Sequence, residues 1–274
     1  MAVIEERYET IAGYRTHYVV AGSGPPLVLV HGVGGSLVSY QRNIAELAAV
    51  ARVYALDLPG HGHSPAPEAE YRAEEGAAFV SAFIQDVCGE PAALVGLSAG
   101  GLMCALAAAE QPELVTRLVL VSSAGFGRRV SWPLRVLTLP FVGRFVETPT
   151  PAQVRAALAR QVYDPATITP ELVEAVYDVW RQPGNRRAFL CSLRSNLSLL
   201  GVRRWRRHLR TASKLAMPVL IIWGQNDTTI PVRYAYRAVK KVAGARLHIF
   251  DRCGHMPPFE QAAEFNRLVV EFLG

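Results

Sequence analysis

The chain has 274 residues, of which 50% are hydrophobic and 19% are charged, and its formal net charge is +6. This composition excludes a disordered or fibrous protein. No apolar run approaches the roughly 20 residues that a membrane-spanning helix needs, and the first ten residues carry three Glu where a signal peptide would be apolar. We therefore predict a globular, cytoplasmic protein without a membrane span.

Short apolar runs with strand character alternate with helix-like segments near both ends of the chain. Strands are predicted at Tyr14–Val20, Leu27–Val30, Arg52–Leu56, Ala92–Val95, Arg117–Val121, Val219–Trp223 and Ala245–Phe250. Helices are predicted at Leu102–Glu110, Tyr234–Val242 and Glu260–Leu273. This alternation indicates an α/β fold, in which helices cover both faces of a parallel sheet.

A long proline-rich stretch interrupts this alternation. Between Val121 and Pro218 lie about 95 residues, whereas a crossover between parallel strands needs only a dozen or more. Residues 124–217 carry 16 basic and five acidic side chains, while the rest of the chain is mildly acidic. We predict an inserted helical segment over residues 124–217, between core residues 1–123 and 218–274, with helices at Ala152–Tyr163, Pro170–Arg181 and Asn185–Leu200.

One motif indicates a nucleophile. The run Gly96-Leu97-Ser98-Ala99-Gly100 matches G-x-S-x-G, follows a predicted buried strand and opens a predicted helix. That context is typical of a nucleophile elbow, in which a sharp turn holds the serine hydroxyl clear of the sheet and glycines avoid clashes. Ser98 is therefore the candidate nucleophile; the alternative is a glycine-rich turn without a catalytic role.

A serine nucleophile needs a base and an acid that orients the base. His255 and Asp227 each follow a predicted strand, so we expect both at the sheet edge where Ser98 lies. Asp251, four residues before His255, is the alternative acid. Asp227 is preferred because a separate strand end can approach His255 from the side opposite Ser98.

The loop His31-Gly32-Val33-Gly34-Gly35 is the candidate for the second half of an oxyanion hole. The backbone N–H of Ala99, directly after the nucleophile, is the first expected donor. Val33 is the expected second donor, with Gly34 as an alternative. Gly34 and Met256 are expected to line the substrate pocket, and His31 to make a structural hydrogen bond.

Three further patterns indicate structure more than chemistry. His61 and His63 with Asp57 suggest metal ligands, but the Pro and Gly around them favour a tight turn, and no complete ligand set is present. The four cysteines are far apart and form no CxxC pair, so we predict buried thiols and neither a disulfide framework nor a zinc site. We expect no metal and no cofactor. The basic run Arg203–Arg210 is expected to be a solvated helix with Trp205 turned inward, not a nucleic-acid contact.

The chain resembles the α/β-hydrolase fold family along nearly its whole length. The motifs HGVGG, DLPGHGHS, GLSAGG, WGQND and CGHMPPFE occur in the order and spacing of that family. The resemblance implies a mostly parallel, eight-stranded sheet flanked by helices, a Ser98–Asp227–His255 triad, and a helical cap, residues 124–217, inserted after the sixth strand. Ser98 stands where haloalkane dehalogenases and epoxide hydrolases of the family have Asp.

The C-terminal third resembles the meta-cleavage-product C–C hydrolases within that family. The similar pieces are RQPGNRRAFL, WGQNDTTIP and ARLHIFDRCGHMPPFEQAAEFNRLVVEFL. The chain departs from those enzymes at three places. Gly34-Gly35-Ser36 replaces a Gly-Pro-Gly sequence, Met256 replaces a Trp after the histidine, and Ala175 or Val176 stands where an arginine grips the substrate carboxylate.

These features leave three functions, of which hydrolysis of a carboxylic ester is preferred. C–C cleavage of an acidic diketo compound is the alternative, in which Arg181 or Arg194 replaces the missing arginine. A ligand receptor on a hydrolase scaffold is the alternative of another class. In each case the partner is a small molecule, and the basic segment is expected to attract anionic substrates. The sequence leaves open whether the chain forms a homo-oligomer.

Overall fold

Eight strands form one sheet in the computed structural model, which describes residues 3–145 and 147–274. Their order is β1-β2-β4-β3-β5-β6-β9-β10; β2 pairs antiparallel with β1 and β4, and the other pairs are parallel. The strands are β1 (Ile4–Ile11), β2 (Tyr14–Ala21), β3 (Pro26–Val30), β4 (Arg52–Leu56), β5 (Ala92–Leu97), β6 (Val115–Val121), β9 (Val219–Gly224) and β10 (Arg246–Phe250). The predicted α/β class with a mostly parallel, eight-stranded sheet is confirmed.

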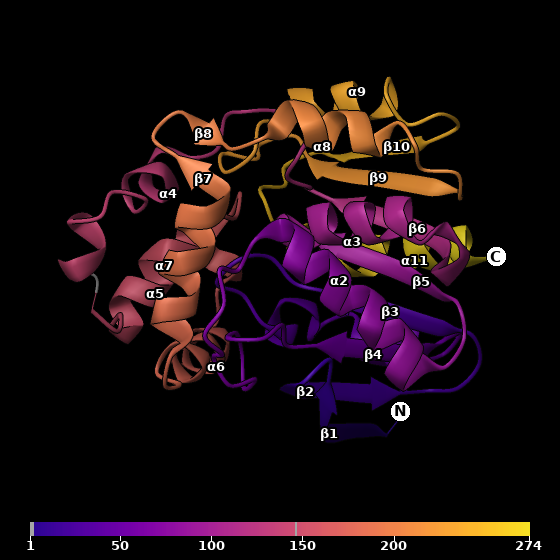
Figure 1. Ribbon diagram of the computed structural model, residues 1–274, viewed down its shortest axis with the longest axis horizontal. Coiled ribbons are helices and arrows are strands. Elements are labelled where there is room, and N and C mark those ends of the chain that lie inside the picture. Colours follow the sequence, from indigo (N-terminus) through magenta and orange to yellow (C-terminus); the bar gives the residue numbers. More distant parts are fainter. Residues whose placement is uncertain (1–2, 146) are drawn as a thin grey trace.

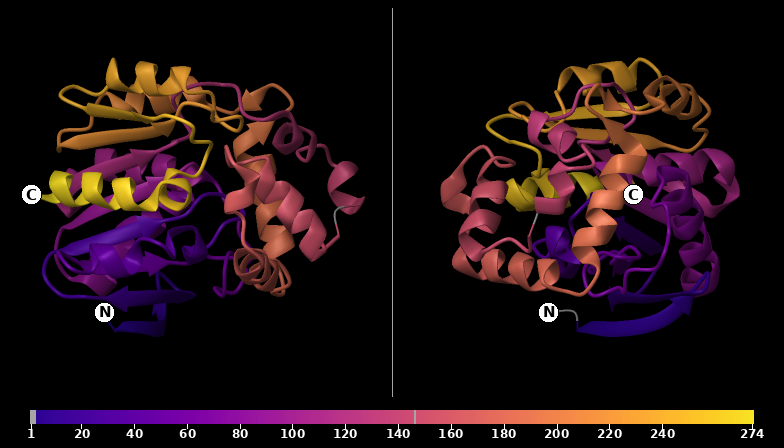
Figure 2. Two further views of the ribbon diagram at one scale, coloured as in Figure 1. Left: turned by 180° about the vertical axis from the view of Figure 1, so that it is seen from behind. Right: turned by 60° about the vertical axis from the view of Figure 1, so that its left-hand side comes forward.

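Helices cover both faces of this sheet (Figure 1; Figure 2). Side chains of β3 alternate between the faces: Val28 and Val30 belong to one apolar cluster, and Leu27 and Leu29 to another. The first cluster includes residues of α2 (Ala73–Phe83), α3 (Ala99–Glu110) and α9 (Arg233–Val239), and the second those of α1 (Ile44–Leu47) and α11 (Ala262–Leu273). Because both faces of the central strands are buried, their sequences are continuous apolar runs.

The edge strand β1 is absent from the predicted strands. Seven of its eight residues are exposed and only Ile11 is buried, so its sequence carries no apolar alternation. It is held instead by pairing with β2 along its whole length. The connecting residues Ala12 and Gly13 both have positive φ, 48° and 83°, which suits a two-residue hairpin turn.

The chain between the sixth strand, β6, and β9 is mainly helical, as predicted. Figure 1 shows α4 to α7 gathered beyond one end of the sheet, while α8 contacts α3. Thr150 and Thr169 cap two of these helices by accepting from backbone N–H groups, and a proline follows each at the first helical position. The elements are α4 (Trp132–Val136), α5 (Pro151–Ala159), α6 (Pro170–Trp180), α7 (Asn185–Asn196), β7 (Leu197–Ser198), β8 (Gly201–Val202) and α8 (Trp205–Ala212).

The basic run is the helix α8 and the residues just before it. Its arginines are exposed, whereas Trp205 is partly buried and packs against the first apolar cluster. Arg237 of α9 lies 5.5 Å from the centre of the Trp205 ring. This is the solvated helix with an inward tryptophan that the sequence predicts. None of the described helices is long and apolar enough to cross a membrane.

The docking of α11 on the sheet can be tested at Phe265, which is fully buried. Phe265→Ala is expected to lower the free energy of unfolding by about 3–5 kcal/mol, because it removes buried apolar contacts and leaves a cavity. Urea unfolding measures the change. Tyr236→Ala, at a side chain that is 46% exposed, is the control and should change it by about 0.5 kcal/mol or less. Equal losses in the two variants would contradict this packing.

Candidate active site

Ser98 lies in the sharp turn between β5 and α3. Its backbone has φ 57° and ψ −115°, a strained conformation for a residue with a side chain. A Cβ at Gly96 would lie 2.6 Å from Cα of Gly101, and one at Gly100 would clash with the carbonyl oxygens of Val30 and His31. The glycines of the motif are therefore required by the packing of the turn on the neighbouring strand ends.

A buried hydrogen bond joins His255 to Asp227. Nδ1 of His255 lies 2.8 Å from Oδ2 of Asp227, and Oδ1 of Asp227 accepts from the N–H groups of Thr229 and Ile230 at 2.8 Å each. Because the carboxylate can only accept, Nδ1 carries the hydrogen and Nε2 is left to take a proton. Asp251, the alternative acid, is exposed in the turn after β10. The structure therefore brings Asp227, and not Asp251, to the histidine.

Ser98 and His255 line one cavity of about 1200 Å³. Its wall comes from loops at the carboxyl ends of the strands and from the helices between β6 and β9. Val33, Gly34 and Met256 line this cavity. The expectation that Gly34 and Met256 contact a substrate stays a prediction. The helical wall is mainly apolar and includes Trp132, Leu134, Val154, Leu158, Val176, Trp180 and Phe189.

The loop after β3 passes directly beside Ser98. A Cβ at Gly32 would lie 3.0 Å from Cβ of Ser98. A turn closed by the Gly35 N–H to Gly32 O bond of 3.1 Å encloses Val33 and Gly34, and Gly34 has φ +70°. Ala99 begins α3 immediately after Ser98. The assignment of Val33 and Ala99 as oxyanion donors stays a prediction.

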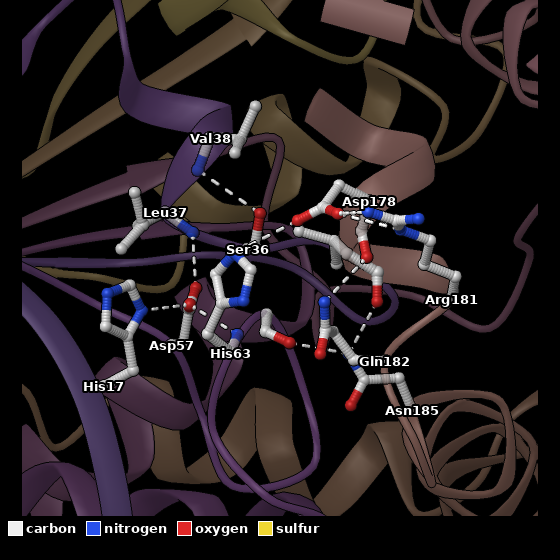
Figure 3. Close-up of polar contacts among 12 residues, drawn as sticks. His17, Ser36, Leu37, Val38, Asp57, His63, Asp178, Arg181, Gln182 and Asn185 are labelled. Carbon is white, nitrogen blue, oxygen red and sulfur yellow. Dashed lines mark hydrogen bonds and ion pairs between the residues drawn. The ribbon is translucent and has the colours of Figure 1, made fainter. Parts of the chain in front are cut away.

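Asp57, at the end of β4, anchors the turn that follows the strand. Its Oδ1 accepts from the N–H of Leu37 at 2.8 Å, and its Oδ2 from Nδ1 of His17 at 2.7 Å and the N–H of His63 at 2.9 Å (Figure 3). Burial alone would raise the pKa of Asp57, but the His17 hydrogen bond and the two backbone N–H groups hold that pKa below its ordinary value. Asp57 is therefore an ion that ties β2, the loop after β3 and its own turn together.

The neighbouring histidines His31 and His61 are buried and uncharged at neutral pH. Burial lowers the pKa of both, that of His61 to about 4. His31 donates through Nδ1 to the carbonyl of Gly32 at 2.7 Å and accepts at Nε2 from the N–H of Leu58 at 3.0 Å. This is the structural hydrogen bonding predicted for His31. Across residues 3–145 and 147–274, three or more His, Cys, Asp or Glu side chains nowhere gather as a metal site.

Two aromatic residues of the cavity wall were not predicted from the sequence. Trp180, at the end of α6, and Phe189, on α7, pack edge to face with ring centres 4.9 Å apart. A Cβ at Gly34 would lie 2.8 Å from the Phe189 ring, so this pair closes over the loop beside Ser98. The available signal was the apolar spacing of α6, where Val173, Val176 and Trp180 recur at helical intervals.

Residues 25–262 match the sequence family described as the alpha/beta hydrolase fold. This chain belongs to the α/β-hydrolase family. The hydrolase is 30% identical over 270 residues to a 2-hydroxy-6-oxo-6-phenylhexa-2,4-dienoate hydrolase from Comamonas testosteroni, covering 96% of this chain and 92% of that one. It is 31% identical over 274 residues to an uncharacterized protein from Mycobacterium tuberculosis, covering 97% and 80%. A solved meta-cleavage product hydrolase from Pseudomonas fluorescens is 29% identical, with a TM-score of 0.83 over 97% of each chain.

The role of Asp57 can be tested with Asp57→Asn. The amide puts N–H groups where a carboxylate oxygen accepts, so the free energy of unfolding at pH 7 should fall by about 3 kcal/mol. A carboxyl whose folded pKa is lowered stabilises above its unfolded pKa and loses that contribution as pH falls through the folded pKa. Urea unfolding should therefore show the gap between wild type and variant closing from about pH 4 downward.

The control for this measurement is Asp86→Asn, at an exposed position in the helical turn that directly follows α2. It should change the free energy of unfolding by about 0.5 kcal/mol or less at every pH. A loss in Asp57→Asn that stays constant between pH 7 and pH 3 would contradict the assignment of an ionised, buried Asp57.

Proposed function

We propose that this hydrolase cleaves carboxylic esters through an acyl-enzyme on Ser98. The observation that carries the proposal is the buried His255–Asp227 hydrogen bond at the wall of the cavity that Ser98 also lines. Base-assisted attack by a serine requires a carboxylate that orients the histidine, and a serine close to that histidine. The Asp227 hydrogen bond supplies the first, and the cavity that Ser98 and His255 share supports the second. Asp227 then orients His255, and His255 is the general base.

In the proposed reaction, Nε2 of His255 takes the proton of the Ser98 hydroxyl as Oγ attacks the ester carbonyl. The N–H groups of Val33 and Ala99 hold the oxyanion of the tetrahedral intermediate. His255 returns the proton to the leaving alcohol as the C–O bond breaks, which leaves the acyl group on Ser98. His255 then takes a proton from a water molecule as its oxygen attacks the acyl carbonyl. It gives this proton to Oγ of Ser98 as the bond from Oγ to the acyl carbon breaks, which releases the acid and restores Ser98.

Residues 124–217 are proposed to act as a cap over this site, between core residues 1–123 and 218–274. The support is that α5, α6 and α7 all contribute side chains to the cavity. An apolar wall excludes water and accepts an apolar acyl chain. Arg160 also lines the cavity, but it is exposed and therefore lies at the rim.

C–C cleavage of a meta-cleavage product is the second candidate, supported by the names of several relatives. One of them is a 2-hydroxy-6-oxononadienedioate/2-hydroxy-6-oxononatrienedioate hydrolase from Burkholderia vietnamiensis, 32% identical over 266 residues. Such acidic substrates need a cation for their carboxylate, yet Val176 contributes an apolar surface to the cavity. Arg181 and Arg194 line a separate recess, and Arg181 binds Asp178 at 2.6 Å. These positions favour the ester.

The two candidates are separated by one substrate panel. p-Nitrophenyl acyl esters of increasing chain length and a yellow ring-fission diketo acid are each mixed with wild type, Ser98→Ala and Ser39→Ala. We expect wild type to turn over the esters and Ser98→Ala to lose at least about 10³-fold in rate, because the nucleophile is absent. Ser39→Ala removes another hydroxyl from the same cavity and is the matched control, expected to retain activity.

Three results would overturn the proposal. Ester hydrolysis by Ser98→Ala at the wild-type rate would show that no acyl-enzyme forms on Ser98. Bleaching of the diketo acid by wild type with no turnover of any ester would transfer the function to C–C hydrolysis. A single turnover that then stops would indicate a receptor.

A further inference from the structure

The loop that carries His255 is enclosed between the end of β9 and the chain that follows α5. On one side, a Cβ at Gly224 would clash with the carbonyl oxygens of residues 253 and 254. On the other side, a Cβ at Gly254 would clash with the carbonyl oxygen of Gln161 and lie 2.9 Å from the carbonyl carbon of Val162. The backbone at residue 254 therefore has no free space toward either neighbour.

Residues 160–163 also bond directly to the loops of both His255 and Asp227. The N–H of His255 donates to the carbonyl of Gln161 at 2.6 Å. The hydroxyl of Thr228, next to Asp227, donates to the carbonyl of Arg160 at 2.9 Å. One short piece of the inserted helical segment is thus attached to both partners of the buried hydrogen bond.

Glu260, at the end of α10 (Pro257–Glu260), joins these pieces. Its Oε1 lies 3.0 Å from the N–H nitrogens of Gly254 and Met256, and its Oε2 lies 2.9 Å from that of Gly254 and 2.7 Å from that of Tyr163. Gly254 and Met256 flank His255, whereas Tyr163 belongs to the inserted segment. One carboxylate therefore accepts from both sides of the histidine and from the segment that packs against it.

We infer that Glu260 is a positioning residue that locks the His255 loop to residues 160–163, so that the imidazole is held for proton transfer only while this segment is docked. The inference rests on the proposed function, in which His255 is the base. It makes residues 160–163 the fixed attachment of the helical segment. Movements that admit substrate must then occur elsewhere in that segment, or they release the histidine.

The chemistry of the contacts requires a carboxylate at this position. Three N–H donors from two parts of the chain need two accepting oxygens. A glutamine of the same length has one accepting oxygen, and its NH₂ group would face an N–H donor. Glu260→Gln must therefore give up either the Met256 or the Tyr163 hydrogen bond, with almost no change in side-chain volume.

The test compares Glu260→Gln with Glu264→Gln in the substrate assay. Glu264 lies on α11, where its carboxylate is 44% exposed and faces His248 and Arg267 at 3.6 Å each. We expect kcat of Glu260→Gln to fall by about 10- to 100-fold, because a small displacement of a reacting group has this effect. KM should change by about twofold or less, since the wall that binds the acyl chain is intact. Glu264→Gln should match wild type.

Two further measurements separate positioning from folding. Titration of active sites with a fluorophosphonate counts the folded sites, and kcat is calculated per counted site. Hydrogen exchange of the Tyr163, His255 and Met256 amides should accelerate by about tenfold in Glu260→Gln and not in Glu264→Gln. If Glu260→Gln does not fold, hydrogen exchange of the wild-type protein is the test. The amides of Tyr163 and Met256 should then open together, with opening rates that agree within about threefold.

Unchanged kcat per site in Glu260→Gln, or independent opening of the two amides in wild type, would overturn the inference. A wild type without Ser98-dependent turnover would instead overturn the proposed function. In that case the exchange data still decide whether Glu260 locks the two segments together.

Discussion

The buried hydrogen bond between His255 and Asp227 depends on how two parallel strands end. β9 and β10 pair in parallel, with Phe250 opposite Gly224, so the loops that follow them leave the sheet at the same edge. The bond joins residues 28 positions apart at 2.8 Å. A buried carboxylate is costly unless its oxygens are satisfied, and the N–H groups of Thr229 and Ile230 satisfy the second oxygen of Asp227. Hydrogen bonds therefore hold both carboxylate oxygens of Asp227 in place.

The same edge of the sheet holds Ser98 in a strained conformation. The strain persists because its surroundings leave no alternative: Gly96 and Gly100 pack against backbone, and the N–H of Ser98 donates to the carbonyl of Val121 on the adjacent strand at 2.9 Å. Asp57 fixes the end of the loop that passes Ser98, because its carboxylate accepts a hydrogen bond from the N–H of Leu37. The candidate site is thus built on strand ends and turns held by hydrogen bonds, and the helical segment supplies most of the apolar wall of its cavity.

The central strands could be predicted from the sequence because strands buried on both faces are continuous apolar runs. The strand Arg52–Leu56 has the same bounds in the prediction and in the structure. The helices α6 and α7 begin at the residues predicted for them, Pro170 and Asn185. α2 and β1 were not predicted. β1 is almost wholly exposed, and its position depends on pairing with β2 and not on its own pattern.

Two hydrogen-bonded clusters that join distant parts of the chain, those of Asp57 and Glu260, were not predicted from the sequence. The Asp57 cluster was interpreted as a tight turn, but its function as an anchor depends on His17, 40 positions away. Glu260 was predicted as the start of a long helix; in the structure that helix begins at Ala262, and Glu260 binds an N–H group 97 positions away. Backbone donors are identical in every residue, so no side-chain pattern could have indicated this contact.

The most direct test of the account is the position of the nucleophile. The protein is treated with a fluorophosphonate, digested, and mapped by mass spectrometry, and the rate of labelling is compared with that of His255→Asn. We expect one phosphonyl group per chain, on Ser98, formed far more slowly in the variant because the base is lost. A label on another residue, or labelling of Ser98 at equal rates in both proteins, would contradict the account.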